Sequence, residues 1–385
     1  SPKSIFPIFT DIIFTKIEKL MNLNGILQYK SDKKKILLFL IITFVSTILG
    51  ILLAEGITAL FFSGEIGDSL SDTTNVFGLK IKILITSVFV FIVPALFFAK
   101  LVNINPLKYL EFNHKFNRQM ILLVVVIMLF SSPFIGFLSQ INEAIISALP
   151  DYFDSVVSWM KSAEMDAKKM TFSFLKMESI TDLFFNLFLI AVIPALGEEL
   201  FFRGVLQKLF IKWTSKPHLS ILITAFLFSA IHMQFFGFLP RFVLGILLGY
   251  FYYFSKSIWM PILAHFFNNA MAVIIMYPSI KQSIKVDVLS DNVEVSLLQS
   301  FISLFAVGIL FYLFYKSVEI KKETETVPHL SIMITAFLFS AIHMQFFGFL
   351  PRFVLGILLG YFFYFTVGIL FYLFYKSVEI KKEIF

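Results

Sequence analysis

Three short polar clusters interrupt otherwise apolar stretches of the chain, and their residue types could do chemistry. The first holds Glu198, Glu199 and Arg203, the second holds His232, and the third holds His265 and Asn269. A charged side chain at bilayer depth costs at least about 2.5–3.5 kcal/mol on insertion scales, so each ionisable group in such a stretch is a candidate functional residue. A carboxylate beside imidazoles can activate water, and imidazole and amide N–H groups can stabilise an oxyanion.

Helical spacing predicts how these side chains are arranged. Glu199 and Arg203 are four residues apart, so they share a helix face and can form an ion pair. Glu198 is rotated by about 100° from Glu199 and stays free to act as a general base. His265 and Asn269 also share a face. Taken singly, an interfacial salt bridge and interhelical hydrogen bonds explain these residues as well, but their occurrence together favours one polar pocket.

The residue types present elsewhere in the chain limit the reactions that such a pocket could catalyse. The chain has no cysteine, and no serine is placed beside a base in a nucleophile turn, so water activation is the expected reaction. Glu198, His232 and His265 could also hold a divalent metal, since two histidines and one glutamate form a catalytic zinc set. The HExxH spacing of zinc proteases is absent. We expect no cofactor, with Zn²⁺ as the alternative.

The elements that carry these clusters must be membrane helices. Of 385 residues, 58% are hydrophobic and 15% charged, and the mean hydropathy is +0.87. Soluble domains carry about 25% charged residues and at most about 50% apolar ones, so soluble, disordered and fibrous classes are excluded. We predict an all-α polytopic transmembrane helical bundle of about eight helices plus a duplicated C-terminal helical hairpin. The expected spans are 36–54, 83–99, 120–138, 183–197, 219–236, 239–254, 258–277 and 297–315.

Charge distribution predicts the orientation. Lysine and arginine gather before the first span and after the second, fourth and eighth, which puts the N-terminus in the cytoplasm of a multi-pass cell-membrane protein. The net charge of +7 is then explained by the cytoplasmic loops, and no nucleic-acid partner is expected. Segment 151–180 has mixed charge and helical periodicity, which predicts a pair of interfacial or extramembrane helices on the outer face.

Near-identical repeats mark the C-terminal end. Residues 217–254 recur at 328–365 with two differences, and 307–323 recur unchanged at 367–383. Ancient repeats retain only weak identity, so we interpret 324–385 as a recent partial duplication or an assembly error. The expected domain organisation is an N-terminal cytoplasmic segment 1–35 (of which 1–20 is possibly extraneous), N-terminal transmembrane helices with outer-face loop helices 36–178, a catalytic core 179–280, a last native helix with a basic tail 281–323, and the duplication 324–385.

The motifs EExxFR at 198–203, FxxxH at 228–232 and HxxxN at 265–269, in this order within apolar helices, resemble those of the CPBP family. That family groups type II CAAX prenyl endopeptidases with bacteriocin-processing and immunity-associated (Abi) membrane proteins. The resemblance covers roughly residues 180–277. It implies an intramembrane endopeptidase that acts on a peptide or protein substrate from a site open towards the cytoplasm.

Carried over motif by motif, the resemblance also implies residue roles. Glu198 would activate the water with help from His232, and His265 with Asn269 would form the oxyanion site. The ion pair of the first cluster would support its helix. Members of the family are often described as metalloproteases, while the family's geometry also fits metal-free water activation, which we favour.

Two other functions remain open at this stage. A catalytically idle membrane factor for bacteriocin immunity or scaffolding would have no need of the full Glu/His/His/Asn set. A proton-coupled transporter would use buried Glu and His as a relay, but here these residues cluster instead of lining a path. The sequence therefore favours the hydrolase.

Overall fold

The computed structural model describes residues 23–61, 76–113, 118–175, 177–277 and 295–319. The described part is helical throughout and contains no strand, as the composition predicted. The chain divides into two units, Ser1–Phe311 and Tyr312–Phe385. The first unit contains all three motif clusters. The predicted duplication and the first 20 residues lie outside the described ranges.

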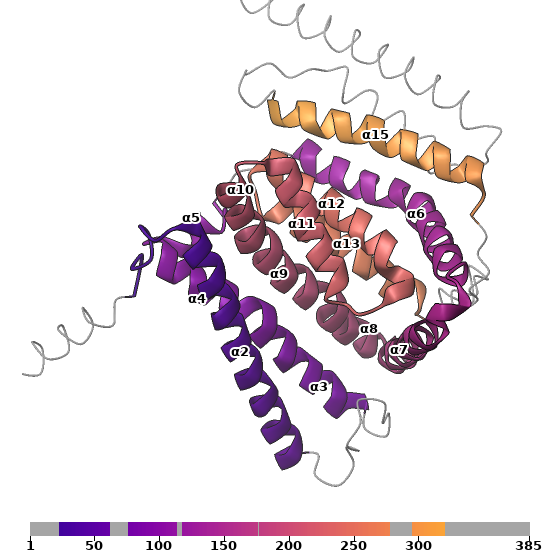
Figure 1. Ribbon diagram of the computed structural model, residues 1–385, viewed down its shortest axis with the longest axis horizontal. Helices are drawn as coiled ribbons and strands as arrows, with labels where there is room; N and C mark the ends of the chain where they lie inside the picture. Colours follow the sequence, from indigo (N-terminus) through magenta and orange to yellow (C-terminus); the bar gives the residue numbers. More distant parts are fainter. Residues whose placement is uncertain (1–22, 62–75, 114–117, 176, 278–294, 320–385) are drawn as a thin grey trace, which may run out of the picture. The chain divides into compact units, whose positions relative to one another are not determined.

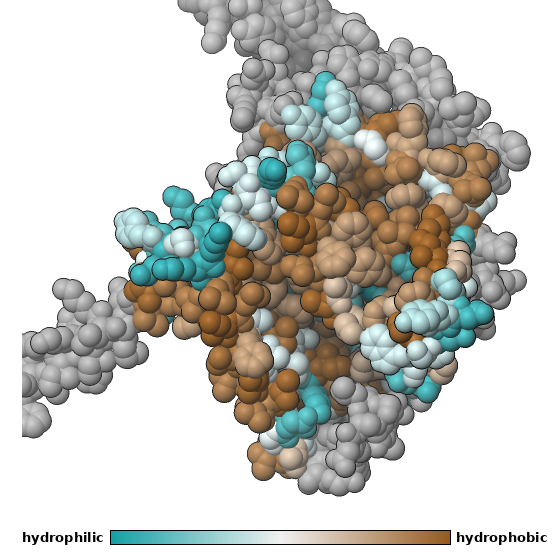
Figure 2. Space-filling model, viewed as in Figure 1, coloured by the Kyte–Doolittle hydropathy of each residue, from teal (hydrophilic) through white to brown (hydrophobic). Residues whose placement is uncertain are grey.

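Eight apolar helices correspond to the eight predicted spans. Six are long enough to cross a membrane: Asp32–Phe61, Val76–Val102, Arg118–Ser147, Ile180–Thr214, Phe235–Ser255 and Leu297–Val318. Two are shorter: Pro217–Ala230 and Trp259–Ile275. A polytopic helical bundle is thus confirmed. Figure 2 shows hydrophobic surface over much of the bundle, with hydrophilic residues gathered over α5 (Pro106–Tyr109) and over α7 (Asp154–Leu175).

The first two crossings are α2 (Asp32–Phe61) and the continuous run α3 (Val76–Ser87), η1 (Val88–Ile92) and α4 (Val93–Val102), which pack against each other (Figure 1). Next comes α6 (Arg118–Ser147), which packs on α12 (Phe238–Ser255) and α13 (Trp259–Ile275). The fourth crossing is the run α8 (Ile180–Asn186), η3 (Leu187–Val192), α9 (Ile193–Glu199), η4 (Leu200–Gln207) and α10 (Lys208–Thr214). The last described helix is α15 (Leu297–Glu319).

Three of these segments, η1, η3 and η4, are π-helical. The first two end just before Pro94 and Pro194, whose rings remove a backbone donor and disfavour regular α-helical bonding to the preceding turn. Wide π turns are frequent at functional sites, and η4 directly follows the two glutamates. The helix that carries the first motif is therefore locally wider before and after the two glutamates, Glu198 and Glu199.

Close packing of α12 depends on two glycines. A Cβ on Gly245 would lie 3.1 Å from Ala225 Cα, and one on Gly249 would lie 2.8 Å from Ile221 Cγ2. Both partners belong to α11 (Pro217–Ala230). Small residues four apart let helix backbones approach closely inside membranes, so α11 and α12 form a tight pair.

The fourth predicted span, 183–197, was too short. The helix continues through the glutamates to Thr214 as one 35-residue run, so Glu198 and Glu199 lie near its middle rather than at its end. The prediction assumed that two carboxylates stop a membrane helix. In the structure Arg203 of the same helix neutralises Glu199, and groups on α12 and α13 bind Glu199, Arg203 and Gln207, so the helix continues past residue 197.

Two further predictions differ from the structure. The fifth span, predicted as 219–236, ends at Ala230, because Met233 has a left-handed φ of 52° and turns the chain into the 3-10 turn η5 (Phe235–Gly237). Segment 151–180 forms one long helix, α7, preceded by a short 3-10 turn, and not a helix pair. The Trp159 ring of α7 contacts Phe235 at 5.0 Å between ring centroids.

Candidate active site

A buried ion pair anchors the first motif. Arg203 Nη1 donates to Glu199 Oε1 at 2.9 Å, and both side chains are 0% exposed. Arg203 Nη2 donates to the carbonyl oxygen of Gly245 on α12 at 2.8 Å. The pairing predicted from the four-residue spacing is thus confirmed, and it fixes the motif helix to α12.

Glu199 also binds the third motif. Its Oε1 accepts a hydrogen bond from His265 Nδ1 of α13 at 2.8 Å. Because a carboxylate paired with arginine is ionised and can only accept, the hydrogen of this bond belongs to Nδ1. The contact therefore fixes the ring orientation of His265 and points its Nε2 away from Glu199.

Glu198 lies on the other side of the same imidazole. Its Oε2 is 4.0 Å from His265 Nε2 and 3.9 Å from His232 Nε2. Glu198 of the motif helix, His265 of α13 and His232 of the turn after α11 thus lie close together. Within the described residues, Glu198 Oε2 has no hydrogen-bond partner although it is buried.

The second histidine is also held with a defined tautomer. His232 Nδ1 lies 2.7 Å from the carbonyl oxygen of Phe228, which can only accept, so Nδ1 carries the hydrogen. Asn142 of α6 secures the neighbouring turn, donating to the Phe235 carbonyl at 2.8 Å and accepting from Leu239 N at 2.9 Å. In its neutral form His232 therefore presents the Nε2 lone pair to Glu198.

The ring of Phe228 packs against Arg203 and against both imidazoles. Arg203 Cζ lies 4.8 Å from its centroid, a cation–π contact. The rings of His232 and His265 stand edge-on to it at 5.2 and 5.8 Å. Phe228, which the second motif contains, thus packs against all three polar clusters and limits the rotation of both histidines.

Asn269 lies one turn beyond His265, as predicted. Its Nδ2 donates to the carbonyl oxygen of Ile190 in η3 at 3.0 Å, and its Oδ1 accepts from Asn268 Nδ2 at 3.1 Å. The amide thus binds a backbone carbonyl of the π-helical stretch. One of its two N–H groups is engaged in this way, and the predicted oxyanion role concerns the other.

Exposure falls steeply across the site. The side chain of His232 is 28% exposed, that of His265 is 5% exposed and that of Glu199 is 0% exposed. Burial lowers the pKa of His232 below its ordinary value of 6.5, while the carboxylate of Glu198 acts to raise it. His232 therefore forms the most open side of the site and favours its neutral form.

Zinc would require tighter geometry than these three residues have. Bonds of about 2.0–2.2 Å in a tetrahedral arrangement separate ligand atoms by about 3.3–3.6 Å, whereas Glu198 Oε2 lies 3.9 and 4.0 Å from the two imidazole nitrogens. Among the described side chains no group of three His, Asp or Glu residues is arranged to hold a metal ion. The donor types suit zinc, but their spacing here does not, and we derive no step through a metal.

One residue of the motif helix was missed in the sequence. Gln207 is 0% exposed, and its Nε2 donates to the carbonyl oxygen of Gly249 at 3.0 Å. It continues the four-residue series of Glu199 and Arg203, and it faces the second glycine of α12 as Arg203 faces the first. That spacing was a signal that could have identified it.

Comparison with known proteins bears on this segment. Residues 180–271 match the family model described as type II CAAX prenyl endopeptidase Rce1-like. The matched segment is similar to that family. It contains every residue of the three motifs, and it confirms the resemblance seen in the sequence. Searches of curated proteins and of solved structures gave no match.

Similarity to this family supports a CAAX-protease-like endopeptidase at the level of the family. The family match ends at residue 271, four residues before the end of α13. The helices α8 to α13 thus form the Rce1-like core. In the sequence, α2 to α7 precede this core and α15 follows it.

Proposed function

We propose that the protein hydrolyses peptide bonds within the membrane, with Glu198 as the general base that activates water. One observation carries the proposal. Glu198 Oε2, His232 Nε2 and His265 Nε2 come from three separate segments, and the nitrogens lie 3.9–4.0 Å from the carboxylate oxygen. That separation exceeds the 2.7–3.2 Å of a direct hydrogen bond. A water molecule that bridges two of these atoms at about 2.8 Å from each would lie beside the line that joins them.

The hydrogen-bond donors and acceptors around the water assign a role to each group. Water has two hydrogens, so it can donate one to Glu198 Oε2 and one to His232 Nε2, which presents its lone pair. Loss of the first proton to Glu198 generates the nucleophile, whose oxygen attacks the scissile carbonyl carbon. Glu198 then returns the proton to the leaving amine as the C–N bond breaks.

His265 would stabilise the oxyanion in its protonated form. Its Nδ1–H is bound by Glu199, which is itself ionised by Arg203. With Nδ1–H bonded to Glu199, Nε2 donates to the developing oxyanion when it also carries a hydrogen. Asn269 would supply the second donor from the amide hydrogen that Ile190 does not use.

The substrate and the orientation are part of the same proposal. We infer a peptide or protein substrate that approaches a multi-pass protein of the cell membrane, with the N-terminus in the cytoplasm as the basic clusters indicate. The family description includes prenyl endopeptidases, and a prenylated substrate is one member of the class to test. No nucleic-acid partner and no resident cofactor are proposed.

Cleavage by the full chain in proteoliposomes tests the proposal. A peptide library that contains prenylated and unmodified members is incubated with wild type, Glu198→Gln, His232→Ala and His265→Ala. A positioned general base contributes about 10²–10⁴-fold, so each variant should lose activity on that scale. His218→Ala is the matched control, since His218 bonds the Tyr250 hydroxyl at 2.9 Å outside the site and its loss should leave cleavage intact.

The outcomes separate the candidate functions. Retained cleavage in Glu198→Gln would overturn the mechanism. If a chelator abolished cleavage and added zinc restored it, the result would favour a metal-dependent mechanism over water activation by Glu198 alone. Peptide binding without cleavage would favour an idle immunity or scaffolding factor. Proton-coupled flux lost in the same variants would favour a transporter.

A further inference from the structure

A second polar site lies at the end of the motif helix, away from Glu198. A cavity of about 600 Å³ opens there, within the range of small-molecule sites. Lys208, which lines it, is ten residues beyond Glu198, which corresponds to about 15 Å along a helix. The cavity is therefore separate from the proposed catalytic groups.

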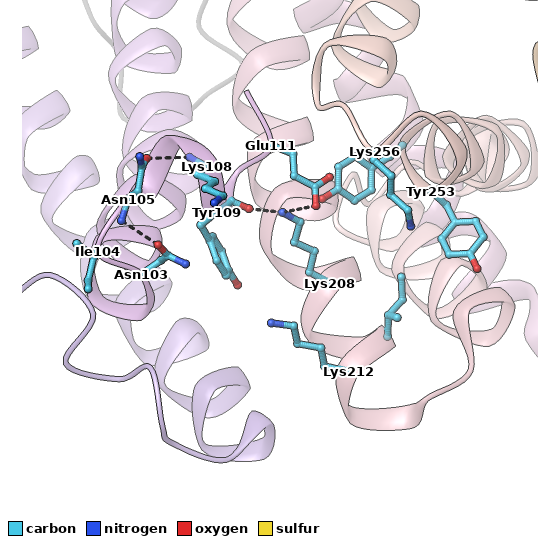
Figure 3. A pocket seen from close by; sticks show the side chains of 12 residues that line it. Asn103, Ile104, Asn105, Lys108, Tyr109, Glu111, Lys208, Lys212, Tyr253 and Lys256 are labelled. Carbon is cyan, nitrogen blue, oxygen red and sulfur yellow. Dashed lines mark hydrogen bonds and ion pairs between the residues drawn. The ribbon is translucent and has the colours of Figure 1, made fainter. Parts of the chain in front are cut away.

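The lining of this cavity is strongly basic. It contains four lysines, Lys108, Lys208, Lys212 and Lys256, against one carboxylate, Glu111. Glu111 Oε1 lies 3.1 Å from Lys208 Nζ and neutralises that lysine (Figure 3). The other three make no ion pair with any residue that the structure describes. An excess of three positive charges therefore remains for a ligand to neutralise.

Aromatic rings line the same cavity. Lys208 Nζ lies 5.0 Å and Lys212 Nζ 6.0 Å from the ring centroid of Tyr109, and Lys256 Nζ lies 4.3 Å from that of Tyr253. Tyr109 is only 8% exposed, yet its hydroxyl has no hydrogen-bond partner among the described residues. Figure 3 shows this hydroxyl pointing towards the side of the cavity where Lys212 lies. A buried unpaired hydroxyl is costly unless a ligand binds it.

The cavity lies where several apolar helices begin or end. Its lining comes from the residues after α4, from α5, and from the ends of α10 and α12. Two partly exposed tryptophans, Trp213 (48%) and Trp259 (40%), lie at the end of α10 and the start of α13. Tryptophan is enriched at headgroup depth. Lysines at helix C-termini also complement the helix dipole, but that role requires neither a cavity nor an unpaired hydroxyl.

We propose that this cavity binds the phosphate of an anionic phospholipid headgroup. The ammonium groups of Lys108, Lys212 and Lys256 neutralise the phosphate, and the Tyr109 hydroxyl donates to one of its oxygens. Basic pockets between transmembrane helices bind anionic headgroups by this chemistry. The glycerol and acyl chains extend from the cavity towards the hydrophobic surface of the neighbouring helices.

Native mass spectrometry of the full chain in detergent tests the proposal, with dioleoyl phosphatidylglycerol as the probe and dioleoyl phosphatidylcholine as the zwitterionic reference. We expect one phosphatidylglycerol to bind at least tenfold more tightly than phosphatidylcholine. Each lysine near a membrane surface is worth about fivefold in affinity for an anionic lipid. The triple variant Lys108→Gln, Lys212→Gln, Lys256→Gln should therefore lose the preference. Tyr109→Phe, which removes only the unpaired hydroxyl, should weaken binding severalfold.

The matched control is the triple variant Lys30→Gln, Lys33→Gln, Lys34→Gln, which removes the same charge from exposed lysines outside the cavity. It should retain the preference. Equal loss in both triple variants would overturn the proposal in favour of diffuse surface charge, as would an unchanged preference in the cavity variant. Competition by soluble glycerol 3-phosphate at an affinity within tenfold of the lipid would overturn the lipid source and leave a soluble phosphate ligand. None of these readouts depends on peptide cleavage.

Discussion

The same substitution at two adjacent carboxylates should have opposite consequences. Glu199→Gln and Glu198→Gln each remove one negative charge and conserve size. In the structure Glu199 carries the charged contacts, while Glu198 faces only the two imidazole nitrogens at about 4 Å. We therefore predict that Glu199→Gln destabilises the fold and that Glu198→Gln abolishes cleavage without destabilising it.

The magnitude at Glu199 follows from what its loss leaves behind. Arg203 is 0% exposed, and its ion-pair partner is Glu199. Removal of one partner of a buried ion pair costs about 3–5 kcal/mol of unfolding free energy, because the other charge remains buried. At roughly 2 °C per kcal/mol for a chain of this size, Tm should fall by roughly 6–10 °C. Cleavage would also fall, since His265 loses the group that orients it.

The expectation at Glu198 is different. Glu198 Oε2 has no hydrogen bond to lose from the described residues. Its neutralisation should change the unfolding free energy by no more than about 1 kcal/mol. Cleavage should fall by about 10²–10⁴-fold, because Gln cannot accept the proton from water.

Thermal unfolding in detergent and single-turnover cleavage of a reporter peptide, measured on the same preparations, separate the two effects. Arg203→Met combined with Glu199→Gln provides a further check, since removal of both charges should restore part of the lost stability. A stable Glu199→Gln protein together with an unstable Glu198→Gln protein would refute the assignment of the two roles.

Three further predictions concern the turn, the helix pair and the chain end. Under the proposed mechanism neutral His232 accepts from the water and burial lowers its pKa, so kcat/KM should persist as pH falls below 6.5 and decline only at lower pH. An acid limb of the profile with its midpoint at or above pH 6.5 would contradict this. Gly249→Ala should destabilise by about 1–3 kcal/mol in thermal unfolding, because its Cβ would meet Ile221 Cγ2 at 2.8 Å, whereas Gly56→Ala, with nothing within 4 Å, should be neutral or slightly stabilising. Deletion of 324–385 should leave peptide cleavage unchanged, since this segment repeats only the second motif; a large loss in a folded protein would show that it contributes to the site.

Much of the arrangement could be predicted from local spacing. The ion pair of Glu199 with Arg203 and the separate orientation of Glu198 both follow from the 100° step of a helix. The eight apolar helices followed from composition and run length. The family match to residues 180–271 confirmed the resemblance carried by the three motifs. The roles of Glu198, His232, His265 and Asn269 remain predictions.

Helix ends were harder to predict, because they depend on partners from elsewhere in the chain. The motif helix continues past residue 197 because His265 and two carbonyl groups of α12 bind its polar side chains. None of these partners is close in sequence. Likewise, the bond from Asn269 to Ile190 uses a backbone carbonyl, which leaves no signal in the residue types. The lysine-lined cavity joins α5, α10 and α12, and only tertiary packing brings these segments together.

Arg203 and Gln207 hold the motif helix against α12, because each donates a hydrogen bond to a backbone carbonyl of α12, at Gly245 and at Gly249. Because Arg203 and Gln207 bind backbone carbonyls one turn apart, the two helices cannot slide lengthwise past each other without breaking both hydrogen bonds at once. Under the proposed function, the substrate would enter past the turn at His232, whose side chain is 28% exposed. Movement of that turn would then set the rate of turnover, while the side of the motif helix that faces α12 stays fixed relative to the reacting atoms.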